Sequence, residues 1–189
     1  MEKLSISKQK LLTALAYLLA TEPVENIKVS ELISKADVSR STFYRVFETK
    51  ESFFQWVLDH YMEGLSGAAK YSASSPRKFY QHYFGYIYDN AIYFKTFNNS
   101  YVWPRFHYEL SQIGIDDYQK FIYRQTNDST LSNVLSHYVV NAHIGVVMAW
   151  LGETPIQSPD KIAELVTAMT SSVFASQGLD LADVFPYRN

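Results

Sequence analysis

The chain has 189 residues, of which 47% are hydrophobic, a formal net charge of −2 at pH 7 and no cysteine. A chain of this length and composition can bury a substantial core. Without cysteine it forms neither disulfides nor sulfur-rich metal sites. Because its beginning lacks the apolar run of a signal peptide, we expect a cytoplasmic protein without a membrane segment.

The first predicted element is a leucine-rich helix that ends before Glu22 and Pro23. Its leucines have helical spacing and lie at positions 11, 12, 15, 18 and 19. A short second helix is expected over residues 31–36, with Ser30 as its N-cap. Asp37 follows at a sharp turn, since aspartate tolerates left-handed backbone better than most residues other than glycine.

A third helix is expected after Ser39, which is a good N-cap residue. Phe43 and Phe47 lie one turn apart on one face of this helix and are expected to be buried. The remaining side chains then face outward: Arg40, Ser41, Thr42, Arg45 and Val46. A short helix, a tight turn and a second helix with this outer face form the helix-turn-helix geometry that enters the DNA major groove.

The next predicted helix is capped by Thr49 and continues through residues 53–65 with apolar positions at helical spacing. Lys50 then stands at a helix N-terminus, where its ammonium and the free backbone amides can share a DNA phosphate. The charge distribution agrees with a DNA-binding N-terminal part. Residues 1–50 carry 8 Lys and Arg against 6 Asp and Glu, whereas residues 51–189 carry 9 against 13.

This stretch resembles the DNA-binding module of the tetracycline-repressor (TetR) family of bacterial transcriptional regulators. The match rests on Val38-Ser39, on Ser41-Thr42-Phe43-Tyr44, on Phe47 and on Lys50-Glu51. The resemblance implies that Tyr44 and Lys50 contact the phosphate backbone. Motif and resemblance together give the predicted DNA-binding set: Lys28, Ser30, Ser39, Arg40, Ser41, Thr42, Tyr44, Arg45, Val46 and Lys50.

Three positions depart from the family pattern. Asp37 stands where glycine is frequent, Val46 where histidine is frequent, and Lys28 where threonine is frequent. The last two are expected to shift phosphate contacts or to bring a thymine methyl group against Val46. The alternative is a plain helical hairpin with a solvated basic face, but such a hairpin has no need of aromatic residues at 43, 44 and 47.

The rest of the chain shows helical periodicity, interrupted by short polar breaks, and no alternating strand pattern. We therefore predict an all-α fold with two domains. Residues 1–50 form a three-helix helix-turn-helix domain, and residues 51–189 form a larger helical domain for regulation and dimerisation.

Residues 129–152 carry no formal charge and are long enough to span a bilayer. Several polar side chains interrupt them, so a buried helix at a protein interface is the better interpretation. A partner helix is expected after Ser158 and Pro159, and together they resemble the dimerisation helices of one branch of the family. The alternative is a monomer core. Small residues on both helices form the predicted dimer interface: Ala142, Gly145, Ala149, Ala168, Ser172 and Ala175.

Residues 79–123 contain 16 of the chain's 30 aromatic residues. Such a cluster either fills a core or lines a pocket for an apolar or aromatic effector, and the sequence leaves both possibilities open. The candidate ligand-binding residues are Tyr80, Phe84, Tyr88, Trp103, Phe106, His107, Tyr123, His137 and Asn141.

An enzyme or a metal protein is the competing class of function. None of the five histidines has the spacing of a metal pair, and no nucleophile elbow or nucleotide-binding loop occurs. We therefore expect no enzyme, metal or cofactor. The expected function is a homodimeric, sequence-specific regulator that binds an inverted-repeat operator in double-stranded DNA. The resemblance to the TetR family favours a repressor that a small molecule releases from its operator. An activator, or an adaptor that no longer binds DNA, remains the alternative.

Overall fold

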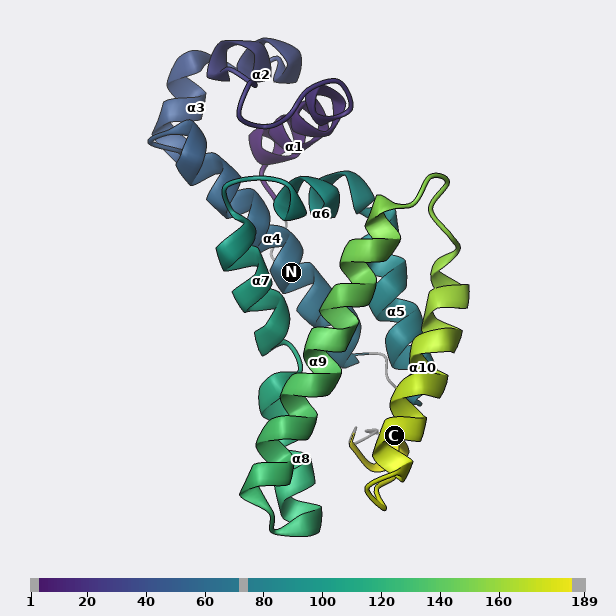
Figure 1. The fold of residues 1–189 in the computed structure, drawn as a ribbon. Coiled ribbons are helices and arrows are strands. Elements are labelled where there is room, and N and C mark those ends of the chain that lie inside the picture. The colour runs from purple at the N-terminus through teal and green to yellow at the C-terminus, as the bar shows by residue number, and fades with distance from the viewer. Residues whose placement is uncertain (1–3, 72–74, 185–189) are drawn as a thin grey trace. The chain divides into compact units, whose positions relative to one another are not determined.

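The computed structural model describes residues 4–71 and 75–184. Their regular structure is helical throughout, without a strand, which confirms the predicted all-α class (Figure 1). The helices are α1 Ile6–Leu19, α2 Val29–Ala36, α3 Arg40–Val46, α4 Lys50–Tyr71, α5 Pro76–Asp89, α6 Ala91–Asn98, α7 Trp103–Gln112, α8 Ile115–Thr126, α9 Ser129–Gly152 and α10 Pro159–Ala175, followed by a 3-10 turn, Leu181–Val184.

The chain folds as two compact units. The first comprises the residues up to Gly64 together with residues 90–106, and the second comprises residues 65–89 together with those from His107 onward. The expected boundary at residue 50 does not coincide with this division. The physical reason lies at the start of α4, where the ring of Phe53 packs 5.0 Å from Phe47 and 5.8 Å from Phe43. The first turns of α4 therefore complete the core under α3.

In the first unit, α1 packs against both α2 and α6. Leu11, Leu15 and Phe43 are fully buried there. The hydroxyl of Tyr93 on α6 donates a 2.7 Å hydrogen bond to the carbonyl of Leu12 on α1. The ring of Tyr93 also stacks on Tyr61 of α4 at 4.1 Å between centroids. α1 and α6 thus support the elements that carry the helix-turn-helix.

In the second unit, α5 packs against α10 and α8 packs against α9. Trp150 is buried against Phe84 at 5.5 Å between ring centroids, and its indole N–H donates to the Gln157 carbonyl at 2.9 Å. As predicted, Ser158 caps α10 with Pro159 in its first turn. These contacts fix α5, α9 and α10 around one apolar core.

Two helix boundaries differ from the sequence predictions. α2 begins at Val29, and the N-cap is Lys28 instead of Ser30. The cause is Glu31, whose carboxylate accepts the backbone N–H of Lys28 at 3.0 Å and so stabilises a helix start that lies earlier in the chain than Ser30. The break at Asn90 between α5 and α6 was not predicted, since its flanks carry no proline or glycine.

Among the described residues, α9 is the one helix long and apolar enough to cross a membrane by length and composition alone. The core helix of a folded domain meets the same criteria. Leu135, Val139, Ile144 and Val147 of α9 are buried inside the second unit, which is the behaviour of a core helix.

Candidate nucleic-acid interface

The turn between α2 and α3 has the geometry expected of a helix-turn-helix. Asp37 adopts the left-handed conformation, with φ 50° and ψ 52°, as its place in the sequence predicted. The amide of Val38 donates to the carbonyl of Ile33 at 3.0 Å, which closes the end of α2. Lys10 of α1 forms a 3.0 Å ion pair with the Asp37 carboxylate and ties the turn to the supporting helix.

The start of α3 is capped by Ser39. Its hydroxyl accepts the backbone N–H of Thr42 at 3.1 Å, as predicted for an N-cap. The same hydroxyl lies 2.8 Å from the Thr42 hydroxyl and 3.0 Å from that of Ser41. Three hydroxyl groups therefore form one hydrogen-bonded cluster at the N-terminus of α3, which restricts the rotamers of Ser41 and Thr42.

The side of α3 opposite the buried Phe43 faces solvent, and Arg40, Ser41 and Arg45 are exposed there. Tyr44 and Val46 are 41% and 42% exposed, which is unusual for residues of their size. The Arg40 guanidinium lies over the Tyr44 ring, 5.3 Å from its centroid, so a cation–π contact orients it. We call this exposed surface of residues 40, 41, 42, 44, 45 and 46 the α3 face.

The other predicted DNA-binding residues lie at two helix starts. Lys28 and Ser30 are exposed at the beginning of α2. Lys50 lies at the beginning of α4, where Thr49 and Ser52 form the reciprocal cap: the Ser52 amide donates to Thr49 Oγ1 at 3.0 Å, and the Thr49 amide donates to Ser52 Oγ at 3.1 Å. The predicted cap at Thr49 is thereby confirmed.

The ammonium of Lys50 does not extend outward in this structure. It donates to three backbone carbonyls of the α1–α2 loop: Val24 at 3.0 Å, Glu25 at 2.9 Å and Ile27 at 3.0 Å. A lysine ammonium has three N–H donors, so all of them are used inside the protein. Its predicted phosphate contact stays a prediction, and in this geometry the ammonium holds the α1–α2 loop.

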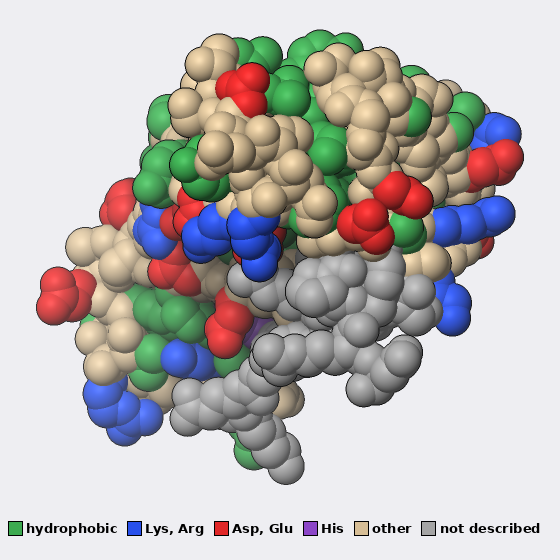
Figure 2. Space-filling model, turned by 90° about the horizontal axis from the view of Figure 1, so that it is seen from below, with side chains coloured by type: hydrophobic (Ala, Val, Ile, Leu, Met, Phe, Trp, Pro, Cys, Tyr) green, Lys and Arg blue, Asp and Glu red, His purple; other side chains and the backbone are tan. Residues whose placement is uncertain are grey.

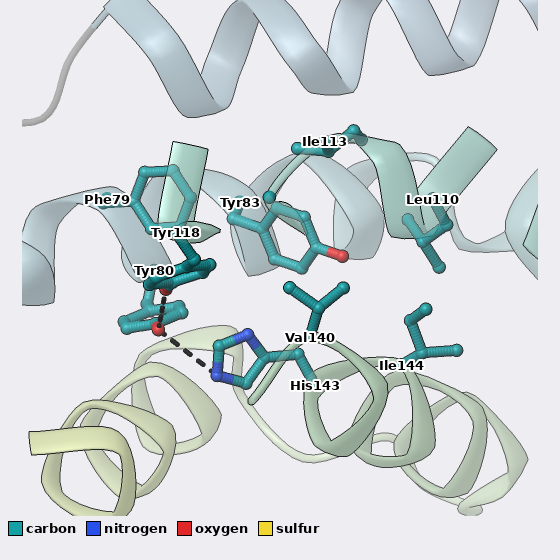
Figure 3. A pocket seen from close by; sticks show the side chains of 10 residues that line it. Phe79, Tyr80, Tyr83, Leu110, Ile113, Tyr118, Val140, His143 and Ile144 are labelled. Atoms are coloured by element: carbon teal, nitrogen blue, oxygen red, sulfur yellow. Dashed lines mark hydrogen bonds between the residues drawn. The ribbon is translucent and has the colours of Figure 1, made fainter. Parts of the chain in front are cut away.

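The second unit contains a small cavity of about 30 Å³ between α5, α8 and α9 (Figure 3). Its lining is mainly apolar and aromatic: Phe79, Tyr80, Tyr83, Leu110, Ile113, Gly114, Tyr118, Val140, His143 and Ile144. This volume holds about one or two water molecules. A pocket for a drug-sized molecule measures roughly 300 Å³ or more, so the cavity as it stands does not accommodate one.

A buried hydrogen-bond chain runs along one wall of the cavity. The Tyr80 hydroxyl lies 3.0 Å from the Tyr118 hydroxyl and 3.2 Å from Nε2 of His143, as Figure 3 shows. The same nitrogen lies 3.0 Å from the Thr170 hydroxyl on α10. Burial lowers the pKa of His143 to about 4, so the ring is neutral at pH 7.

Tyr83 differs from Tyr80 because no hydrogen bond joins its hydroxyl to the described part of the chain. The side chain is 7% exposed, and its hydroxyl points toward Val140 and the cavity in Figure 3. Burial is the main cause that raises the pKa of Tyr83, and the nearby Tyr80 raises it further, so the hydroxyl keeps its proton. The hydroxyl is therefore a donor that faces the cavity, and among the described residues it is not one of the fully buried polar atoms that lack a partner.

Only Tyr80 of the predicted ligand-binding residues lines this cavity. Phe84 and Phe106 are fully buried core residues, whereas Tyr88, Tyr123, His137 and Asn141 are exposed. Trp103 and Phe106 fall in the first unit and His107 in the second. The ligand-binding role of the predicted residues stays a prediction, and the cavity is also lined by Tyr83, Tyr118 and His143, which the sequence did not single out.

Helical spacing held part of the signal for these residues. Tyr80 and Tyr83 are three apart on α5, while Val140 and His143 are three apart on α9. His137 lies seven residues before Ile144 and so has nearly the same direction on the helix, yet it is exposed, as is Asn141. Periodicity alone therefore does not separate His137 from His143.

The predicted dimer residues are all exposed in the single chain: Ala142, Gly145, Ala149, Ala168, Ser172 and Ala175. Larger apolar side chains that were not predicted lie on the same two helices. Val134 and Tyr138 of α9 are 59% and 61% exposed, and Leu165 and Met169 of α10 are 45% and 54% exposed. We call these exposed residues of α9 and α10 the outer face.

Charge is mixed on the face of the molecule that Figure 2 shows. Lys and Arg side chains lie interspersed with Asp and Glu there, so the described side chains on this face form no patch of a single sign. In the part of the chain that the structure describes, no group of three or more His, Cys, Asp or Glu side chains is placed to hold a metal ion.

Two sequence families match the chain. Residues 11–57 match "Bacterial regulatory proteins, tetR family", and residues 74–172, more than half of the chain, match "Transcriptional regulator C-terminal region" of the TetR type. The protein belongs to the TetR family of bacterial transcriptional regulators. It is a DNA-binding regulator with a helix-turn-helix domain, as the resemblance of residues 29–53 implied. Regulators of this family bind operator DNA, dimerise and are generally not enzymes.

Several solved structures share the fold. A transcriptional regulator from Aquifex aeolicus VF5 aligns with a TM-score of 0.69 and 15% identity over 89% of this chain and 99% of its own. The dihydroxyacetone kinase operon activator DhaS gives 0.68 and 14% over 92% and 98%. A TetR transcriptional regulator from Streptococcus agalactiae 2603V gives 0.63 and 20% over 87% and 93%. No curated protein is significantly similar in sequence.

Proposed function

We propose that the protein is a homodimeric repressor that binds an inverted-repeat operator and leaves it when a small molecule binds the second unit. The α3 face is the observation that carries this proposal. A seven-residue helix is capped by Ser39, held by the Asp37 turn, and presents arginine, hydroxyl and aromatic groups outward. This is the chemistry and geometry of a recognition helix in the major groove.

The side chains of the α3 face have different proposed tasks. Arg40 and Thr42 lie in the first turn, which is the part of a recognition helix that meets base edges. Val46 offers an apolar contact for a thymine methyl group. Tyr44, Lys28 and Ser30 are proposed to contact phosphate oxygens, and Arg45 to add positive charge. Ser39 acts through the cap that orients α3.

The outer face is proposed to join two copies of the chain. An exposed apolar stripe on two adjacent, charge-poor helices is costly in water unless a partner covers it. The small residues allow close helix approach: beyond its chain neighbours and the nearby backbone of its own helix, a Cβ added at Gly145 would meet no atom within 4 Å, so space is available for a partner helix. Two copies related by a two-fold axis would then present two α3 helices to an inverted repeat.

The proposed effector is an uncharged apolar or aromatic molecule that carries a hydrogen-bond acceptor. Tyr83 supplies a hydroxyl donor at the cavity, and the remaining wall is apolar or already hydrogen-bonded. Charged ligands are disfavoured because burial of a charge without a partner is expensive. Since the cavity has about 30 Å³, the effector must bind a minor, opened conformation and shift the population toward it.

The proposal is tested by selecting duplexes from a random DNA pool with the purified full chain. The expected product is an inverted repeat whose half-sites lie about one helical turn apart, 10–10.5 base pairs, or a multiple of it. Retention must fall steeply with salt. Recovery of no enriched sequence, with no salt-dependent retention, would identify an adaptor that has lost DNA binding.

Repression is separated from activation with a reporter gene. The selected operator is placed over a promoter in cells with and without the protein. A repressor lowers expression, and the α3 variant Arg40→Ala restores it. If expression instead rises with the intact protein and falls with the variant, the protein is an activator with the same α3 face.

A further inference from the structure

We infer that Lys50 is a positioning residue whose ammonium holds the α1–α2 loop against the start of α4, both in the free protein and on DNA. It thereby fixes where α2 begins. This inference rests on the proposed DNA-binding function only for its effect on operator affinity, because the contact itself is intramolecular.

The hydrogen-bonding capacity of the Lys50 ammonium is fully used within the protein. Three carbonyl oxygens from residues 24, 25 and 27 converge on one nitrogen at 2.9–3.0 Å. Val24 and Ile27 are each 2% exposed, so the loop is anchored in the core on both sides of Glu25. Hydrogen bonds from a charged donor are about twice as strong as neutral ones.

The three carbonyls depend on this lysine. Among the described residues, no backbone amide of a turn, loop or cap donates to the carbonyl of Val24, Glu25 or Ile27. If the ammonium moved out to a DNA phosphate, the carbonyls of Val24 and Ile27 would lose a donor in a part-buried place. A buried acceptor that is left without a donor loses stabilisation that nothing replaces, which opposes that movement.

The Lys50 contact links the start of α2 to the start of α4. The clamped loop ends at Lys28, which is the N-cap of α2, while Lys50 is the first residue of α4. The α1–α2 loop, the start of α2 and the first turn of α4 are thus held by one side chain. The α3 face lies on the short helix that follows α2 and precedes α4 in the chain. If the α1–α2 loop is no longer held by Lys50, the orientation in which α3 meets DNA can therefore vary.

Two substitutions at Lys50 distinguish a phosphate contact from the proposed hold on the α1–α2 loop, which we call the clamp. Lys50→Met keeps the aliphatic stem but removes the charge and all three donors. Lys50→Arg keeps the charge, but its planar guanidinium does not present three N–H groups to oxygens converging on one point. A phosphate group forms hydrogen bonds with arginine readily, whereas three carbonyl oxygens that converge on one point do not suit a planar guanidinium. Lys28→Met is the matched control, because Lys28 is exposed at the neighbouring helix start.

The first measurement is amide hydrogen exchange in the free, full-length protein. We expect exchange at residues 26–32 to become roughly tenfold faster or more in Lys50→Met and in Lys50→Arg. Lys28→Met is expected to exchange like the natural chain. Unchanged exchange in Lys50→Met overturns the clamp, whether or not the protein binds any DNA.

The second measurement is the salt dependence of affinity for the selected duplex. We expect Lys50→Met and Lys50→Arg to bind more weakly with the slope of the natural chain, because every phosphate contact is kept. Lys28→Met is expected to flatten the slope by about 0.9 for each phosphate that the variant no longer neutralises. A flatter slope for Lys50→Met, with natural affinity in Lys50→Arg, shows a phosphate contact and overturns the inference.

A third measurement uses the unmodified side chain, so that a variant that fails to fold does not decide the matter. The Lys50 ammonium, held by three carbonyls, should give a ¹H–¹⁵N signal that exchanges with water far more slowly than that of Lys28. This signal should persist in the DNA complex. Its absence from the free protein, or its loss on DNA binding, overturns the inference.

Discussion

The hydroxyl of Tyr80 on α5 lies 3.2 Å from Nε2 of His143 on α9, and the hydroxyl of Thr170 on α10 lies 3.0 Å from the same nitrogen. One imidazole nitrogen thus connects three helices of the second unit. Because burial lowers the pKa of His143 to about 4, this connection is made by a neutral ring. Protonation would place an unpaired charge in the core.

This arrangement predicts a loss of stability in mild acid. The unfolded histidine binds a proton near pH 6.5, whereas the folded one does so only near pH 4. Between these values the unfolded state binds more protons, so the free energy of unfolding decreases as the pH falls. The full effect is roughly 3 kcal/mol, present above pH 6.5 and lost as the pH approaches 4.

Urea unfolding at a series of pH values and one protein concentration measures this effect. His143→Gln should be less stable than the natural chain at pH 7 and should lose less stability on acidification. His137→Gln is the control for the loss of an imidazole, because His137 is exposed on the same helix. Parallel profiles for His143→Gln and the natural chain would contradict the assignment.

Two tyrosines three residues apart on α5 should respond differently to the loss of a hydroxyl. Tyr80→Phe removes hydrogen bonds to Tyr118 and His143 and should destabilise the protein by about 1–3 kcal/mol. Tyr83→Phe removes a hydroxyl that lacks a partner in the described chain and should leave stability nearly unchanged. Thermal unfolding of both variants provides the comparison, and an equal loss in the two would show that Tyr83 also has a structural partner.

The helix-turn-helix could be predicted from sequence because its determinants are local. Asp37 gives the turn, Ser39 the cap, and Phe43 and Phe47 the buried side, all within eleven residues of each other. Ser30 was assigned wrongly because two capping arrangements compete at the start of α2. The Glu31 carboxylate stabilises the earlier start, and propensity alone does not rank the two.

The cavity and the Lys50 contact could not be predicted in the same way. Aromatic density showed that rings gather, but the choice of which ring faces a cavity depends on how α5, α8 and α9 pack. Lys50 has a long side chain that reaches loop carbonyls more than twenty residues away in sequence. Its direction is set by tertiary structure, and no local pattern encodes it.

The outer face predicts which substitutions disrupt assembly. Glutamate at Gly145 would be buried at a symmetric interface and would meet its own copy there, so dimerisation should weaken strongly. The same substitution at exposed Gln125 of α8 is the control, since it lies outside the outer face. Sedimentation at micromolar concentration distinguishes dimer from monomer. A Gly145→Glu variant that sediments as the natural protein does would place the interface elsewhere.

The α3 face predicts a division between specificity and general affinity. Arg40→Ala and Thr42→Ala should each cost roughly 1–3 kcal/mol for every good base contact that the substitution removes, and should relax the base preference at one position of each half-site. Tyr44→Phe keeps the ring under the Arg40 guanidinium, so it should retain the base preference and weaken binding to all sequences if the hydroxyl contacts phosphate.

Titrations of the selected operator and of single-base variants at several salt concentrations separate these effects. Removing a base contact changes the ranking of sequences, whereas removing a phosphate contact changes the salt slope. Arg77→Ala, an exposed arginine of α5, is the control for a simple change of net charge. If Arg40→Ala and Thr42→Ala bind every variant as the natural chain does, α3 is not the recognition helix.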